Sequence, residues 1–66
     1  MNNKIRVARA EVRMTKQQLA DAAGVSRQTI NAIESGKFVP STVLALKMAR
    51  IFGKQVEEIF QLEDED

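Results

Sequence analysis

Three polar residues at helical spacing, Arg27, Gln28 and Asn31, carry hydrogen-bond donors that could recognise the edges of DNA bases. An arginine can donate twice to guanine O6 and N7, and glutamine or asparagine can form two hydrogen bonds with adenine. If Ile30 and Ile33 face inward, Gln28 falls nearly opposite this apolar pair at about 100° per residue. The pattern therefore predicts a helix with an apolar inner face and a donor-rich outer face.

The segment around these residues, Lys16 to Ser35, predicts two short helices joined by a tight turn. Ala20 is small enough to let the two helices cross closely, and Gly24 can take the positive φ that ends the first helix. Ser26 can cap a second helix that starts at Arg27. This arrangement matches the helix-turn-helix motif, whose second helix enters the major groove of DNA.

The remaining elements follow from apolar spacing, caps and helix-ending glycines. Thr15 and Gln18 form a T-x-x-Q capping box for the first motif helix. Ile5, Ala8 and Val12 are expected along one face of the first helix. The expected helices cover residues 3–13, 16–23, 27–35, 42–52 and 56–60, and residues 61–62 could pair with the N-terminal residues in a small ribbon.

The run TKQQLADAAGVSRQTINAIESGKFVPS, followed by LALKMARIFG and VEEIF, resembles the phage-repressor (Cro/cI, or XRE) helix-turn-helix family. Within it, the chain is most similar to small stand-alone repressors of the cytolysin-repressor type. The resemblance covers about residues 3–60 and implies an all-α, compact five-helix bundle of the lambda-repressor-like DNA-binding type, with room for a tiny terminal β-ribbon. It divides the chain into a helix-turn-helix domain, residues 1–62, and an acidic tail, residues 63–66.

The resemblance also implies which side chains would contact DNA. The expected base contacts are Arg27, Gln28, Asn31 and Ala32. The expected phosphate contacts are Thr15, Lys16, Gln17, Thr29, Ser35, Lys37 and Phe38, the last through its backbone. Lys16 departs from the family, which has a glutamine there; a lysine at a helix N-terminus still suits an anion. The alternative for Arg27, Gln28 and Asn31 is an ordinary solvated helix face, and for Lys37 it is a solubilising charge.

Arg9 and Glu34 match family positions that form an inward ion pair between the first and third helices. The spacing makes such a pair feasible, because Arg9 follows Ala8 and Glu34 lies at the edge of the Ile30 and Ile33 face. We interpret the pair as structural: it would orient the recognition helix without touching DNA.

Composition excludes several other functions. The 66 residues contain neither His nor Cys, so the common zinc ligands and the usual neutral-pH base are missing, and we expect no catalytic residues, metal or cofactor. No apolar run approaches the roughly 20 residues of a membrane span, and no signal peptide opens the chain, which predicts a cytoplasmic protein. All ten Lys and Arg lie in residues 1–56 with three acids, a net charge of +7, whereas residues 57–66 carry −6.

The helix expected over residues 42–52 is too apolar for a single contact. Its core-facing residues could be Thr42, Ala45, Met48, Ala49 and Phe52. Leu44 and Ile51, two turns apart, would then stack on an adjoining flank near Val56 and Ile59. These four residues are the expected dimer interface. The alternative is that a wide core absorbs them.

The sequence thus predicts a sequence-specific, double-stranded DNA-binding regulator, a homodimeric repressor that occludes a palindromic promoter site. The main alternative is an antitoxin or adaptor whose chief partner is another protein. A metal or small-molecule sensor is disfavoured because 66 residues leave no room for a ligand domain beside this motif. The acidic tail is expected to be solvated, or to compete with DNA for the basic face. Neither the operator nor any regulatory protein partner follows from the residues.

Overall fold

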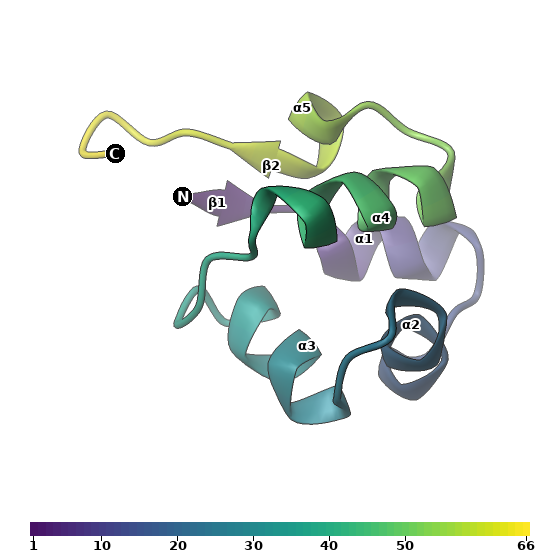
Figure 1. The fold of residues 1–66 in the computed structure, drawn as a ribbon. Coiled ribbons are helices and arrows are strands. Elements are labelled where there is room, and N and C mark those ends of the chain that lie inside the picture. The colour runs from purple at the N-terminus through teal and green to yellow at the C-terminus, as the bar shows by residue number, and fades with distance from the viewer.

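A computed structural model describes residues 1–66 as five helices and one small ribbon (Figure 1), which confirms the expected all-α architecture. In chain order the elements are β1 (Asn2–Asn3), α1 (Ile5–Glu11), α2 (Lys16–Ala23), α3 (Arg27–Glu34), α4 (Thr42–Phe52), α5 (Val56–Ile59) and β2 (Phe60–Gln61). The helices α2 and α3 lie on one side of α1 and α4, and α5 and β2 lie on the other (Figure 1).

The ends of α2 and α3 are fixed by the predicted local signals. Thr15 and Gln18 form the capping box: Thr15 Oγ1 accepts from the Gln18 N–H at 3.0 Å, and Gln18 Oε1 accepts from the Thr15 N–H at 2.8 Å. Gly24 has φ 74°, a left-handed conformation that costs a glycine little, and it lets the chain reverse. Ser26 Oγ then accepts from the Thr29 N–H at 3.1 Å and starts α3.

The first helix is shorter than predicted. It begins at Ile5 because Asn3 belongs to β1, and it ends at Glu11 because Arg13 takes a positive φ of 55°. Val12 therefore lies beyond the last helical residue and is 48% exposed, so its predicted place on the Ile5 and Ala8 face was wrong.

The C-terminal boundaries shift for a related reason. The ribbon pairs Asn2 with Gln61 and Asn3 with Phe60 in antiparallel register. Because Phe60 is extended and paired, α5 ends one residue earlier than predicted, at Ile59. Leu62, predicted to join the ribbon, lies outside it and is exposed. The third helix likewise ends at Glu34, with Ser35 as its C-cap.

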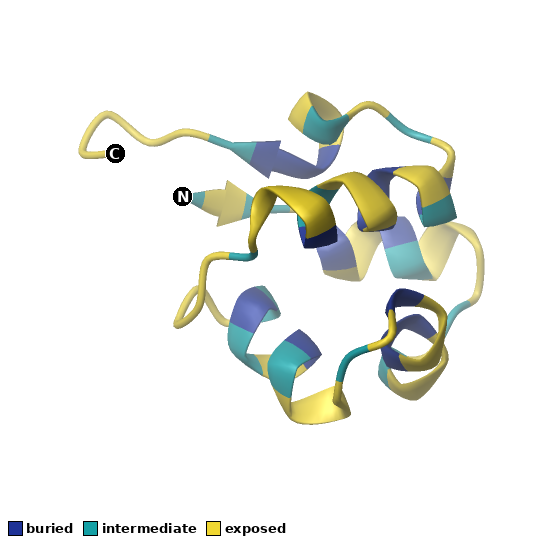
Figure 2. Ribbon diagram, viewed as in Figure 1, coloured by how far each residue is buried: buried dark blue, intermediate teal, exposed yellow.

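All helices contribute to one apolar core, seen as the inward-facing dark blue segments in Figure 2. It consists of Ile5, Ala8, Leu19, Ala20, Ala23, Ile30, Ile33, Leu44, Met48, Ala49, Phe52, Ile59 and Phe60. No buried side-chain nitrogen or oxygen lacks a hydrogen-bond partner. The two isoleucines of α3 pack into this core, and the opposite face of that helix is exposed to solvent.

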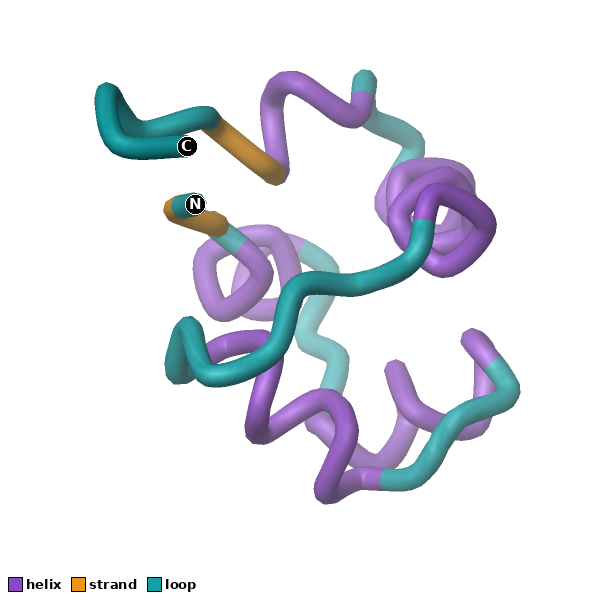
Figure 3. The backbone as a smooth tube through the Cα atoms, turned by 60° about the vertical axis from the view of Figure 1, so that its left-hand side comes forward, coloured by secondary structure: helices purple, strands orange, loops and turns teal.

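The loop over residues 35–41 spans the distance from the end of α3 to the start of α4 (Figure 3). The acidic tail curls back onto the N-terminus, where the Met1 amino group donates to Asp66 Oδ1 at 3.1 Å. This hydrogen bond raises the pKa of the amino group. The tail lies at the ribbon end of the molecule in both Figures 1 and 3, away from α3, and so does not cover that helix.

Candidate nucleic-acid interface

The outer face of α3 presents polar side chains with no partner inside the protein. Arg27, Gln28 and Asn31 are exposed, and the side-chain hydrogen bonds on this helix involve other residues. Ala32 is half-buried beside them. The donors of these three polar side chains are thus free to bind an external acceptor.

Two open hollows flank this face, and cationic side chains line both. The first, about 480 Å³, lies along the C-terminal half of α3 and is lined by Arg6, Lys16, Gln28, Asn31, Ala32, Glu34, Ser35 and Lys37. The second, about 670 Å³, lies beside the start of α3 and is lined by Arg9, Arg13, Met14, Thr15, Lys16, Gln17 and Arg27. We call them the Arg6 hollow and the Arg13 hollow. Lys16 borders both.

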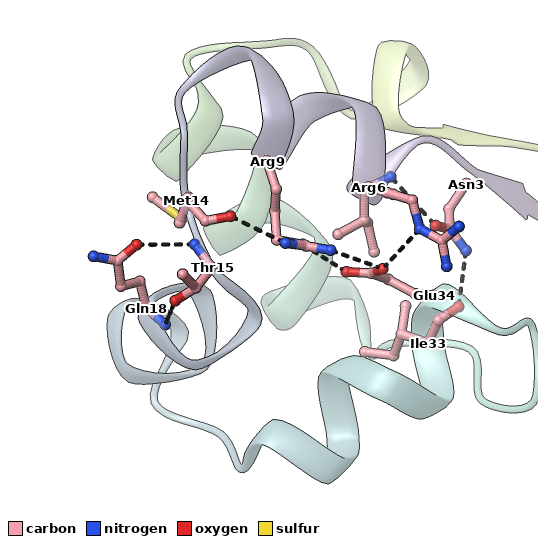
Figure 4. A network of polar contacts seen from close by, with 9 residues as sticks. Asn3, Arg6, Arg9, Met14, Thr15, Gln18, Ile33 and Glu34 are labelled. Atoms are coloured by element: carbon pink, nitrogen blue, oxygen red, sulfur yellow. Dashed lines mark hydrogen bonds and ion pairs between the residues drawn. The ribbon is translucent and has the colours of Figure 1, made fainter.

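Glu34 is the only carboxylate in either lining, and an arginine neutralises it (Figure 4). Arg9 Nε donates to Glu34 Oε2 at 2.8 Å and Arg9 Nη2 donates to Oε1 at 3.2 Å. The side chain of Glu34 is only 4% exposed and that of Arg9 14%. Arg9 Nη1 also donates to the Met14 carbonyl at 3.0 Å, so the pair joins α1, the following turn and α3. The cationic side chains that line the two hollows therefore have few acidic partners within the protein.

A second polar contact fixes the far end of α3. Asn3 Nδ2 donates to the Ile33 carbonyl at 2.8 Å, and Asn3 Oδ1 accepts from the Ile5 N–H at 3.3 Å (Figure 4). Together with the Arg9–Glu34 pair, this contact sets the orientation of α3 relative to α1. The outer face is consequently held in a defined orientation by contacts at the opposite side of the helix.

The seven predicted phosphate contacts differ in how many free donors they keep. Lys16 and Lys37 have no ion pair, whereas Gln17 Nε2 already donates to Asp21 at 2.9 Å. The hydroxyls of Thr15, Thr29 and Ser35 each take part in a local hydrogen bond. The Phe38 N–H donates to the Ala32 carbonyl at 3.2 Å and is therefore not free for a phosphate, contrary to expectation.

Two cationic residues in the hollows were not singled out from the sequence. Arg6 and Arg13 come from α1 and the turn that follows it, three residues before and four after Arg9. That spacing was the available signal, because in the helix expected over residues 3–13 it places all three arginines on one side. Only the packing of α1 against α3 reveals that this side borders the hollows.

The predicted dimer residues are partly wrong. Leu44 is 8% exposed and Ile59 fully buried, so both belong to the core of the protomer, while Ile51 and Val56 are half-buried against it. Thr42, predicted to face the core, is exposed. The physical reason is that α4 carries apolar residues on most of its circumference, and the core takes the face that contains Leu44, Met48 and Phe52.

Three apolar residues of α4 and its preceding loop are more than half accessible: Val39, Val43 and Leu46, while Phe38 in the same loop is 49% exposed. Val43 and Leu46 are three residues apart and hence neighbours on the helix surface. Val39 and Leu46 also border an apolar hollow of about 200 Å³, with Pro40, Ala45 and Val56 among its other lining residues. We call these three exposed residues and the hollow the α4 patch.

None of the helices has the length and apolar character that crossing a bilayer requires. No group of three or more Asp and Glu side chains is arranged to hold a metal ion.

Residues 5–59 match the family model described as helix-turn-helix. An uncharacterized HTH-type transcriptional regulator of Methanocaldococcus jannaschii is 50% identical over 66 residues, which is the full length of both chains. YgzD, an HTH-type transcriptional regulator of Bacillus subtilis, is 42% identical, again over the full length of both. The crystal structure of the restriction-modification controller protein C.AhdI from Aeromonas hydrophila is similar with a TM-score of 0.77 and 27% identity, over 85% of each chain.

Proposed function

This chain belongs to the helix-turn-helix family and is a DNA-binding transcriptional regulator, and we propose that it is a homodimeric repressor of a palindromic operator. The observation that carries the proposal is the outer face of α3: Arg27, Gln28 and Asn31 are exposed, have free donors and stand between two cation-lined hollows. A recognition helix needs such a face, because base edges are recognised by donors and acceptors at fixed positions.

In this proposal α3 lies in the major groove and each outer side chain has a separate role. Arg27, at the start of the helix, donates to a guanine, and Gln28 pairs with an adenine. Asn31 and the small Ala32 contact the neighbouring base pairs. Lys16 and Lys37 neutralise phosphates at the borders of the groove and add affinity without sequence preference.

The α4 patch is the proposed dimer interface, in place of the buried Leu44 and Ile59. A two-fold operator presents half-sites about one helical turn, or 34 Å, apart, so the two α3 helices need a rigid connection at that spacing. The protomer measures 31 × 22 × 20 Å, which allows two copies side by side to span that distance. Burying Val39, Val43 and Leu46 would also supply apolar area that a core of this size lacks.

Repression follows from simple occlusion. A dimer on the operator would exclude the transcription machinery from an overlapping promoter. Such occlusion needs only the DNA-binding fold, and the family match, residues 5–59, spans most of the chain. The two relatives come from an archaeon and a bacterium, whose DNA lies in the cytoplasm, and we place the action of this protein there.

A second candidate is an antitoxin or adaptor that uses the α4 patch to bind a different protein. The exposure of three large apolar side chains in one place favours this candidate as much as a dimer. The two differ in their response to salt, because DNA binding weakens steeply as counterions are released, whereas an apolar protein contact does not.

Selection of bound sequences from a random duplex pool tests the proposal, with sedimentation of the protein alone and with the selected duplex. We expect a two-fold symmetric sequence and two protomers per site. Enrichment of no sequence would reject the proposed operator. A monomer bound to an asymmetric site would reject the dimer.

A further inference from the structure

Two arginines outside the helix-turn-helix motif border the hollows beside α3. Arg6 belongs to α1 and lines the Arg6 hollow together with Gln28, Asn31 and Lys37. Arg13 follows α1 and lines the Arg13 hollow, as Arg27 does. One cationic side chain from the α1 segment therefore stands near each half of the outer face of α3.

The charge of Arg6 is not neutralised within the protein. Both oxygens of Glu34 already accept hydrogen bonds from Arg9, and Arg6 Nε is 3.8 Å from Oε1, beyond hydrogen-bond distance. The Arg6 side chain is 79% exposed. Because Arg9 neutralises Glu34, the cluster of three charges keeps a net positive charge, and the guanidinium that faces solvent beside α3 is that of Arg6 (Figure 4).

The backbone at Arg13 points to a role for its side chain. Arg13 is the only residue other than glycine with a positive φ, 55°, and residues with a Cβ are strained in this conformation. Its side chain makes no hydrogen bond or ion pair with α1 or any other element. A glycine would adopt this conformation without strain. The arginine is strained here, and no contact of its side chain within the protein offsets that strain.

We propose that Arg6 and Arg13 are phosphate-binding residues that position α3 in the groove, Arg6 beside the C-terminal half of the helix and Arg13 beside its start. The proposal rests on the proposed function, because it assigns these residues to the same DNA complex. Arginine suits this role, since its guanidinium can donate two parallel hydrogen bonds to a phosphate. Because these contacts would be made to phosphates and not to base edges, both residues should act equally on every sequence.

The test measures the affinity of Arg6→Gln and Arg13→Gly for the selected duplex and for a random duplex, from about 50 to 200 mM salt. Arg50→Gln is the matched control, because it removes the same charge from an exposed position on α4 that borders neither hollow. For each test variant we expect the slope of log affinity against log salt to fall by about 0.9, with an unchanged ratio of specific to random binding. Arg6→Lys and Arg13→Lys should keep the parental slope.

The melting temperature separates binding from folding. Arg13→Gly should melt no lower than the parent, because glycine relieves the positive φ, although it loses DNA affinity. Slopes equal to that of Arg50→Gln would overturn the proposal while the parent still binds its duplex. Failure of the parent to bind any duplex would instead overturn the proposed function, and this inference with it.

Discussion

The outer face of α3 and the α4 patch differ in the kind of side chain that is exposed without a partner in the protein. On α3 two isoleucines enter the core and the opposite side is polar, with free hydrogen-bond donors and cations nearby. On α4 four residues enter the core, yet Val43 and Leu46 remain exposed. The first surface is suited to a ligand with many acceptors and negative charge, the second to an apolar surface. One core of 13 residues supports both.

Substitutions on the two surfaces should therefore have different effects. Changes on α3 should alter which sequence is bound and how binding depends on salt. Changes on α4 should alter association and leave base preference intact. The residues that connect α3 to α1 should affect the whole fold.

The largest expected effect is that of Glu34→Ala, which removes the connection between α1 and α3. Arg9 would keep a charge that is 14% exposed and has lost its carboxylate. Loss of one partner of a buried pair costs about 3–5 kcal/mol, a large part of the stability of a small domain. Thermal unfolding followed by circular dichroism should show a large drop in melting temperature. An unchanged melting temperature would show that the pair does not orient α3.

The double variant Arg9→Met with Glu34→Met is the control for that experiment. It removes both charges, so no uncompensated ion remains, and buried pairs replaced by apolar residues are often neutral for stability. It should melt much closer to the parent than Glu34→Ala does. A double variant as unstable as the single one would mean that the network to Met14, rather than the charge balance, holds the helices together.

The next effect concerns base recognition by α3. Arg27→Ala and Gln28→Ala should each weaken binding to the selected duplex by about 1–3 kcal/mol. Binding to random duplex should change less for Gln28→Ala, because arginine also contributes charge. Fluorescence anisotropy with both duplexes measures the two quantities. Parental affinity in both variants would remove α3 as the recognition surface.

A smaller effect is expected at the α4 patch. Val43→Gln with Leu46→Gln should weaken self-association by at least tenfold, about 1.4 kcal/mol, since a buried valine or leucine contributes about 1.5–3 kcal/mol. Sedimentation equilibrium gives the dimer constant directly. The same double exchange at Val7 and Val12, which are similarly exposed but lie elsewhere, is the matched control. Equal effects of the two double variants would argue against a specific interface.

The smallest effect is that of Lys16→Ala on the salt dependence of DNA binding. Lys16 borders both hollows and has no ion pair in the protein. Its loss should reduce the salt slope by about 0.9 and leave the melting temperature nearly unchanged. Lys47→Ala, an exposed lysine on α4, provides the comparison. A lower melting temperature for Lys16→Ala would indicate that this residue supports the fold.

How much the sequence could predict differs between the same two regions. The bounds of α2 and the caps Thr15 and Ser26 were predictable because capping depends on residues three positions apart. The buried face of α4 was not, since Leu44 and Leu46 are equally apolar and only packing against α2 and α5 selects one of them. Arg6 and Arg13 were missed because their place beside α3 depends on how α1 crosses the motif.

The most direct test of the central claim, that the outer face of α3 determines sequence preference, is a parallel duplex selection with the parent and Gln28→Ala. The variant should enrich the same site with relaxed preference at one base position, repeated symmetrically in each half-site. Arg6→Gln, selected alongside, should enrich the parental sequence unchanged. An identical preference at every position for Gln28→Ala and the parent would contradict the claim.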